Sequence, residues 1–349
     1  MAENEIKDSE ISGAYIEITN RCNLNCRDCY NASGLNCTTC EITPEDLEKF
    51  ITMLYENCDA KSFSISGGEP TMHTRWNEVC DMIERMKHIK FTVITNGTTG
   101  NKRLKELLEN NDHVTVQYSI DGTCAEIHDQ MRGKGKFDIT MKNIAAIKPK
   151  VKPYFHMVVA PFNRDNIKEY FDFAEEHNAT PTFSYTSKHG NANEIWEEIS
   201  LNDSQRLESL TVIIDEYKKR KIENIPAPFC TIKCALTDRK NKFNLCVTPY
   251  GDIYPCQGLY DKKFSLGILH DFDLSAIIKE AETMRQTLIA RTEMDYGCKR
   301  CLVRSICGKG CAASAYTLCG DMMGFDGDCD YRRKVLIKYY LMPSAKESS

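Results

Sequence analysis

The chain has 349 residues, of which 42% are apolar and 27% are charged, so it can bury one large hydrophobic core and a smaller second one. Its formal net charge of -5 argues against a nucleic-acid backbone as the main partner. The N-terminal residues, MAENEIKDSE, lack the basic and apolar regions of a signal peptide, and no apolar run is long enough to span a membrane. We therefore expect a soluble, cytoplasmic protein with neither a nucleic-acid nor a membrane partner.

Strands and helices alternate from residue 14 to about residue 187, because apolar or β-branched runs are followed by amphipathic segments. The predicted strands are 14–19, 61–66, 91–95, 114–120, 154–160 and 182–187. The predicted helices are 44–56, which Thr43 caps and Pro44 opens, 76–88, 101–110, 138–147, 166–177 and 205–221. Six strand–helix units joined by right-handed crossovers predict an α/β fold, a partial (β/α)6 parallel barrel.

The composition changes after a link that contains Pro226 and Pro228, because ten of the 18 cysteines lie beyond residue 229. We expect a polar tail at 1–13, the barrel at 14–200, a connecting helix and linker at 201–228, a small irregular cysteine-rich domain at 229–335 and a tail at 336–349. A cytoplasmic chain keeps its thiols reduced, so metal or cluster ligation explains the cysteines better than disulfides do.

Three cysteines, Cys22, Cys26 and Cys29, form a C-x3-C-x2-C array directly after the first predicted strand. An electron-transfer iron–sulfur cluster is held by four cysteines, so three thiolates leave one iron open for another ligand. A zinc site or a disulfide is the alternative that spacing alone allows.

Small polar residues and glycines follow the next predicted strands. They occur in the segments 67–70 (GGEP), 95–98 (TNGT) and 119–122 (SIDG). Because catalytic groups of parallel barrels lie at the carboxyl ends of the strands, we expect these segments and the cysteine array to meet on one rim.

The array and the GGEP segment together resemble the radical S-adenosylmethionine (SAM) enzymes, and the resemblance covers nearly the whole chain. It implies a 4Fe-4S cluster whose open iron chelates SAM, and a flavodoxin- or ferredoxin-like electron donor. One position departs from the family, because Asp28 stands where an aromatic residue usually packs near the adenine. The SAM contacts that the resemblance implies are Tyr30, Gly67, Gly68, Glu69, Pro70, Thr95, Asn96, Ser119, Asp121 and Arg132.

The C-terminal cysteines resemble the SPASM domain, an extension of radical SAM enzymes that carries auxiliary four-iron clusters. By this resemblance the outer auxiliary cluster is bound by Cys298, Cys301, Cys307 and Cys329. The inner one is bound by Cys230, Cys234, Cys256 and Cys311. Cys246 remains an alternative inner ligand, Cys319 an alternative to Cys329, an open iron in the inner cluster is possible, and zinc is the competing metal.

The remaining cysteines have simpler interpretations. Cys58, Cys80 and Cys124 are expected to be small core residues. Cys37 and Cys40 lie near the predicted rim, where a plain loop is the simplest reading and a contact with substrate or metal is the alternative.

The resemblance to SPASM-bearing proteins implies modification of a ribosomally made peptide, by thioether or carbon–carbon cross-links. Only 21 residues precede Cys22, so we expect a peptide substrate to be recognised by a separate leader-recognition protein or directly by the barrel and SPASM surface. Three alternatives remain. They are radical oxidation or epimerisation of a tetrapyrrole or sugar, sulfatase formylglycine maturation, and a non-enzymatic electron carrier or zinc scaffold. Gln257 argues against the sulfatase reaction, because it replaces an aspartate base of those enzymes by an amide. His156 is a candidate acid or base on the strand 154–160, with a packed core histidine as the other interpretation.

Overall fold

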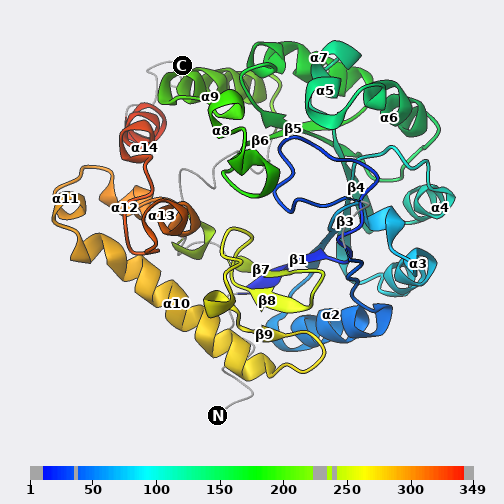
Figure 1. Ribbon diagram of the computed structural model, residues 1–349, viewed down its shortest axis with the longest axis horizontal. Helices are drawn as coiled ribbons and strands as arrows, with labels where there is room; N and C mark the ends of the chain where they lie inside the picture. Colours follow the sequence, from blue (N-terminus) through cyan, green and yellow to red (C-terminus); the bar gives the residue numbers. More distant parts are fainter. Residues whose placement is uncertain (1–10, 35–37, 223–233, 238–241, 342–349) are drawn as a thin grey trace.

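One sheet organises the molecule. The computed structural model describes residues 11–34, 38–222, 234–237 and 242–341, and nine strands within these residues form the sheet in the order β6-β5-β4-β3-β2-β1-β7-β8-β9. The strands β1 to β6 pair in parallel, which confirms the predicted partial barrel. In Figure 1 the helices α2 to α7 surround the outer side of these strands.

The strands have the following bounds: β1 Ile11–Glu17, β2 Ser62–Ser66, β3 Lys90–Thr95, β4 Val114–Ser119, β5 Tyr154–Val159, β6 Thr180–Tyr185, β7 Phe243–Val247, β8 Asp252–Tyr254 and β9 Gly267–Ile268. The helices around the barrel are α2 Pro44–Cys58, α3 Trp76–Arg85, α4 Lys102–Asn110, α5 Ala125–Arg132, α6 Lys136–Ala145, α7 Ile167–Glu176, α8 Trp196–Ile199 and α9 Asp203–Lys219. The later helices are α10 Leu274–Met294, α11 Tyr296–Lys299, α12 Arg304–Cys307, α13 Ala312–Cys319 and α14 Cys329–Leu336.

Two strands begin at least two residues earlier than their patterns predict. β1 starts at Ile11 because this segment pairs on one side with β2 and on the other with β7, and Gly13 allows the close approach to β2. A Cβ at Gly13 would lie 1.8 Å from Ser62 O. β6 includes Pro181, which a strand at the edge of the parallel part tolerates because one side of its backbone needs no partner strand.

The sequence patterns did not predict the helices α5, α8 or α10 to α14. α5 is mostly polar, and only His128 and Met131 are buried, so its periodicity is weak. α10 has 21 residues and lies within the predicted cysteine-rich domain, so this domain contains a long regular element. The helix α2 matches its prediction closely, because the Thr43 side chain accepts a hydrogen bond from Asp46 N at 3.1 Å.

The two faces of the parallel strands differ in chemistry. Apolar side chains such as Phe63, Val116 and Phe155 are fully buried between strands and helices. The alternate side chains, which point to the inner face of the barrel, are mostly polar and include Ser64, Gln117 and His156. Cys58 and Cys80 lie in the core as expected, whereas Cys124 is only half-buried because it is the N-cap residue of α5.

Candidate active site at the carboxyl ends of the barrel strands

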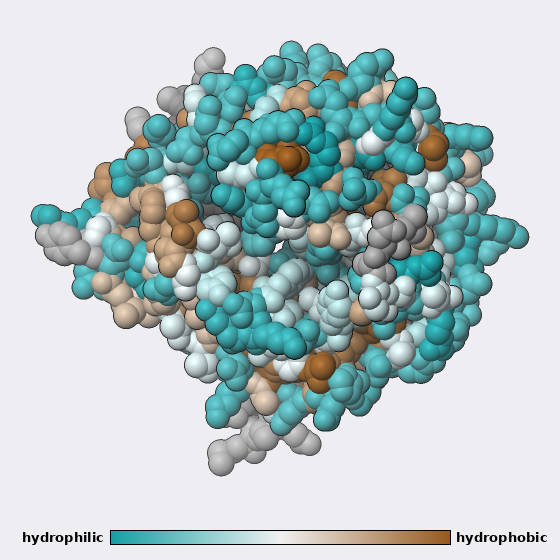
Figure 2. Space-filling view, viewed as in Figure 1, coloured by the Kyte–Doolittle hydropathy of each residue, from teal (hydrophilic) through white to brown (hydrophobic). Residues whose placement is uncertain are grey.

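The loop that follows β1 brings the thiols of Cys22, Cys26 and Cys29 together. They pack in one small group with Leu24, and the Sγ atoms of Cys22 and Cys29 each accept a backbone N–H at 3.4 Å. Burial raises the pKa of Cys22 to about 12 and that of Cys26 to about 11. In Figure 1 this dark blue segment crosses the centre of the barrel, and Figure 2 shows that the same face is hollowed near its centre with a mostly hydrophilic rim.

Gly67 and Gly68 support this loop from the end of β2. A Cβ would lie 2.3 Å from Thr19 O at Gly67 and 2.2 Å from Arg21 O at Gly68, so no side chain fits at either position. The Gly68 N–H donates to Thr19 O at 2.7 Å, and the Glu69 N–H donates to Arg21 O at 2.8 Å. The close backbone approach that the two glycines allow is therefore made with the start of the cysteine loop.

The carboxylate of Glu69 joins the ends of β2 and β3. It is fully buried and accepts hydrogen bonds from Thr71 Oγ1 at 2.6 Å, Thr95 Oγ1 at 2.7 Å and Asn96 N at 2.8 Å. The Asn96 side chain also reaches Cys22 Sγ at 3.9 Å. Pro70 starts a buried 3-10 turn beside them, so the structure brings these predicted residues together around the cysteine loop.

Arg132 lies on the other side of the loop, at the last position of α5. Its Nε donates to Asp121 Oδ2 at 2.6 Å, and its Nη1 reaches Cys26 Sγ at 3.7 Å. The guanidinium holds the pKa of the buried Asp121 below its usual value, whereas burial raises the pKa of Asp28 to about 6. A fixed positive charge therefore stands beside the three thiols.

Tyr30 extends from the cysteine loop toward the inner face of the barrel. Its hydroxyl donates to the carboxylate of Glu17 on β1 and lies 3.1 Å from Tyr15 OH. Ser119 is half-buried at the end of β4, where it is aligned with His156. The predicted SAM contacts thus fall on both sides of the cysteine loop, and Tyr30 faces into the barrel.

The structure adds Glu17 and Tyr260 to the residues that the sequence predicts for this site. Glu17 is 1% exposed and also accepts from Tyr260 OH at 2.9 Å. A charged residue inside the apolar run of the first strand was the available signal, because such a side chain needs buried partners. His156 is the candidate acid or base that the sequence predicts. Its two ring nitrogens form hydrogen bonds with the hydroxyls of Thr182 and Ser184, each at 2.9 Å.

The C-terminal cysteines fall into two regions. Burial raises the pKa of Cys298, and the nearby Cys307 and Cys329 raise it further. Arg333 Nη2 reaches Cys329 Sγ at 3.7 Å. Cys234 is buried near Cys311. Cys230 and Cys37 lie outside the described residues.

Cys246 and Cys319 have other partners. Cys246 Sγ lies 3.0 Å from Tyr260 OH on the inner face of the barrel. The Cys319 thiol donates to Ala315 O at 3.0 Å within its own helix. Cys40 is half-buried, and its N–H donates to Asn20 Oδ1 at 3.0 Å.

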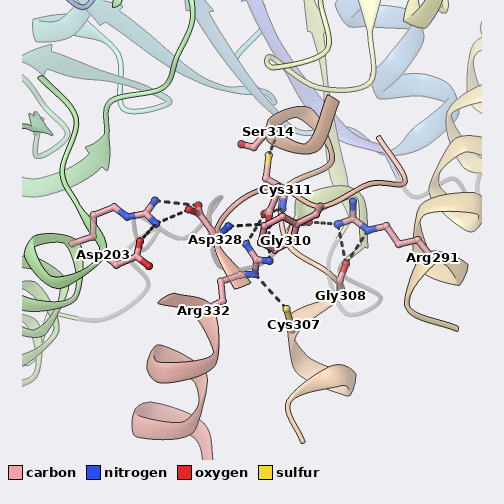
Figure 3. A network of polar contacts seen from close by, with 12 residues as sticks. Asp203, Arg291, Cys307, Gly308, Gly310, Cys311, Ser314, Asp328 and Arg332 are labelled. Carbon is pink, nitrogen blue, oxygen red and sulfur yellow. Dashed lines mark hydrogen bonds and ion pairs between the residues drawn. The ribbon is translucent and has the colours of Figure 1, made fainter. Parts of the chain in front are cut away.

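Two buried arginines, Arg291 and Arg332, lie near Cys307 and Cys311, as Figure 3 shows. Arg332 Nε donates to Cys307 Sγ at 3.4 Å, and its terminal nitrogens bond both carboxylate oxygens of Asp326 at 2.5 and 2.8 Å. Arg291 is completely buried near Cys234 and Cys311.

The partners of Arg291 are carbonyl oxygens, those of Gly308, Gly310 and Met322, and no described Asp or Glu forms an ion pair with it. A buried cation without a carboxylate partner is costly. An anionic cluster held by thiolates would neutralise it, so these residues fit such a group.

Within the described residues, no group of three His, Cys, Asp or Glu side chains is close enough to hold a single metal ion. A four-iron cluster makes a different demand, because each thiolate binds its own iron.

None of the helices in the described part of the chain combines the length and the apolar character that a membrane span requires.

The geometry agrees with the sequence comparison. Residues 16–174 match the Radical SAM superfamily. This segment holds the cysteine loop and strands β2 to β5, and its match to the superfamily supports a radical SAM enzyme. The matched superfamily implies a 4Fe-4S cluster and SAM as cofactors.

Similar proteins cover most of the chain. Mycofactocin maturase MftC of Mycolicibacterium smegmatis is 24% identical over 330 residues, which are 90% of this chain and 81% of the relative. The antilisterial bacteriocin subtilosin biosynthesis protein AlbA of Bacillus subtilis is 31% identical over 267 residues, which are 74% of this chain but only 57% of AlbA. The crystal structure of Streptococcus suis SuiB bound to S-adenosylmethionine has a TM-score of 0.72 at 18% identity and covers 92% of this chain and 78% of SuiB. SuiB has also been solved with its precursor peptide SuiA.

Proposed function

We propose that this enzyme matures a ribosomally made peptide by forming a thioether or carbon–carbon cross-link at an unactivated side-chain position. The observation that carries the proposal is the packing of Cys22, Cys26 and Cys29 in one group between the Glu69 network and Arg132. The similarity to MftC and AlbA supports a peptide as the substrate class.

The three loop cysteines would hold the 4Fe-4S cluster, and the polar groups around them would hold SAM. When bound, the cluster and SAM supply the radical that removes a hydrogen atom from the substrate. Arg132 places a positive charge where the SAM carboxylate is expected, and Asp121 fixes its orientation through an ion pair with a 13% exposed guanidinium. Glu69 keeps Asn96 beside the loop. The protein thus supplies orientation.

We further propose two auxiliary 4Fe-4S clusters in the C-terminal region. Cys298, Cys301, Cys307 and Cys329 would hold the outer one. Cys234, Cys256 and Cys311 would hold the inner one, with Cys230 as the fourth ligand. The grouping of Cys298 with Cys307 and Cys329 supports Cys329 over Cys319, because the Cys319 thiol is directed at its own helix.

Anaerobic purification with iron and sulfide analysis tests the cofactor assignment. Three four-iron clusters predict about twelve irons per chain, and SAM with a strong reductant should yield 5′-deoxyadenosine. The Cys26→Ala variant should form none, whereas the matched variant Cys40→Ala should behave like the wild type. Zinc in place of iron, or full cleavage by Cys26→Ala, would contradict the assignment.

The substrate class is tested with short peptides encoded beside the gene. Incubation with SAM and reductant should lower the mass of one peptide by two hydrogen atoms, and fragmentation should locate the bond. A flavodoxin- or ferredoxin-like protein is the expected physiological donor. We also expect weak capture of the peptide by the enzyme alone and tighter capture once a separate leader-recognition protein is added. Tight binding by the isolated enzyme would exclude the need for that partner.

A further inference from the structure

A buried carboxylate, that of Glu17, lies between the cysteine loop and the C-terminal segment. Glu17 is 1% exposed on the inner face of β1. Its Oε1 accepts hydrogen bonds from Tyr30, the residue after Cys29, and from Tyr260, which follows the strand β8. One carboxyl group therefore links the cysteine loop to the C-terminal segment.

The hydrogen bonds continue on both sides of Glu17. Tyr260 OH is 3.0 Å from Cys246 Sγ on β7, and Tyr30 OH is 3.1 Å from Tyr15 OH. Tyr15 OH in turn lies 2.7 Å from Ser66 Oγ on β2. This chain of groups, which we call the Glu17 network (Ser66, Tyr15, Tyr30, Glu17, Tyr260 and Cys246), runs across the inner face of the barrel from β2 to β7.

The network has one strong proton acceptor. Phenols and thiols bind their protons tightly in buried surroundings, whereas the carboxylate accepts from both phenols. Within the described residues no Lys, Arg or His forms an ion pair with Glu17, so its charge is held by hydrogen bonds. Burial raises its pKa above the usual value of a glutamate, which makes it a stronger base than an exposed glutamate.

We propose that Glu17 accepts, through Tyr260, the proton that the peptide loses when its bond-forming thiol or other X–H group is deprotonated. This inference rests on the proposed function.

The step balances without a further reactant. The substrate X–H bond breaks as its proton moves to the Tyr260 oxygen, and the Tyr260 proton moves at the same time to Glu17 Oε1. The products are a substrate anion, an unchanged phenol and a neutral carboxylic acid. The contact between Cys246 and Tyr260 shows that a sulfur atom can approach this oxygen, and Tyr260 itself is half-buried rather than closed off.

The titratable groups that face Glu17 define the expected pH dependence. They are the phenols of Tyr15, Tyr30 and Tyr260 and the thiol of Cys246, all of which have pKa values raised by burial. The raised pKa values keep these groups protonated, so Glu17 is the group of this network that changes its charge as the pH rises. Product formation should rise with pH as Glu17 loses its proton and then reach a plateau.

The test uses the reconstituted enzyme with the peptide that the wild type modifies, and it measures modified peptide and 5′-deoxyadenosine separately. Glu17→Gln keeps the shape of the side chain but cannot take a proton. It should retain iron and deoxyadenosine formation, lose product on the order of 100-fold, as is typical of a lost general base, and lose the pH inflection. Tyr260→Phe should lower product with the carboxylate still in place, and Glu17→Asp should restore part of it.

A matched control separates this role from a structural one. Glu216→Gln removes a carboxylate that is 7% exposed on α9 and lies outside the Glu17 network. It should keep product and pH profile unchanged. If Glu17→Gln lost iron, Tyr260→Phe with wild-type product would still overturn the proposal, as would Glu17→Gln with the wild-type pH profile. A wild-type enzyme that cleaves SAM and modifies no peptide would instead refute the proposed function itself.

Discussion

The ion pair between Arg332 and Asp326 gives the sharpest stability prediction. The Arg332 side chain is 2% exposed and that of Asp326 is 0% exposed. Asp326 also accepts from Cys311 N at 3.0 Å, so the pair connects α14 with the segment between two proposed cluster ligands. No room remains between Gly310 and the ion pair, because a Cβ at Gly310 would lie 2.2 Å from Asp326 Oδ2 and 2.3 Å from Arg332 Cζ.

Arg332→Leu removes both hydrogen bonds to Asp326 and leaves a buried carboxylate without its counter-ion. Two charged hydrogen bonds at about 2 kcal/mol each predict a loss of about 4 kcal/mol, within the range of about 3–5 kcal/mol typical of a broken buried pair. The double variant Arg332→Leu with Asp326→Asn should lose less than Arg332→Leu alone, because no bare charge remains.

Urea unfolding followed by circular dichroism measures these losses, on the cluster-free chain and on the reconstituted enzyme. The matched control is Arg304→Leu, because Arg304 is 39% exposed and pairs with Glu293 at 3.4 Å. Such a surface pair contributes less than about 1 kcal/mol. An Arg332→Leu variant that is no less stable than Arg304→Leu would refute the reasoning.

Two further predictions concern the barrel. Gly68→Ala should cost more than about 3 kcal/mol of unfolding free energy, because its Cβ would lie 2.2 Å from Arg21 O. The matched variant Gly34→Ala should cost little, because nothing lies within 4 Å of the added carbon. Equal urea midpoints for the two variants would contradict this. Burial lowers the pKa of His156 to about 4, below its unfolded value of 6.5, so the unfolded chain binds the extra proton between these values. The His156 contribution to stability is therefore complete above about pH 6.5 and falls by up to about 3 kcal/mol as the pH drops toward 4, and His156→Gln should remove this part of the pH dependence. A variant with the same loss on acidification would show that other groups cause it.

Local patterns predicted the barrel well because its strands are buried on the helix side and read as apolar runs. The spacing of Cys22, Cys26 and Cys29 likewise fixed their proximity, since a short loop after a strand leaves them little freedom. The Glu69 network followed from the rule that strand ends meet on one rim.

Contacts between residues far apart in the chain could not be predicted from the sequence. The partner of Glu17 is Tyr260, 243 residues away, and no local pattern connects them. The pair of Arg332 and Asp326 depends on a gap that Gly310 leaves open, which only the folded chain reveals. The helix α5 was missed because its polar sequence is stabilised by the site that it borders, through Arg132 and Asp121.

The parallel pairing of β1 with β7 has a consequence for protein synthesis. Ser12 and its partner Phe243 are 231 residues apart, so at about 5–20 residues per second the ribosome needs roughly 12 to 46 s to make the second strand after the first. During that time the nascent chain exposes an unpaired strand edge beside the three cysteines of the loop. The segment with Cys246 and Tyr260 is made after the six parallel strands β1 to β6, so iron delivered before that point would meet a cysteine loop still open to solvent on that side.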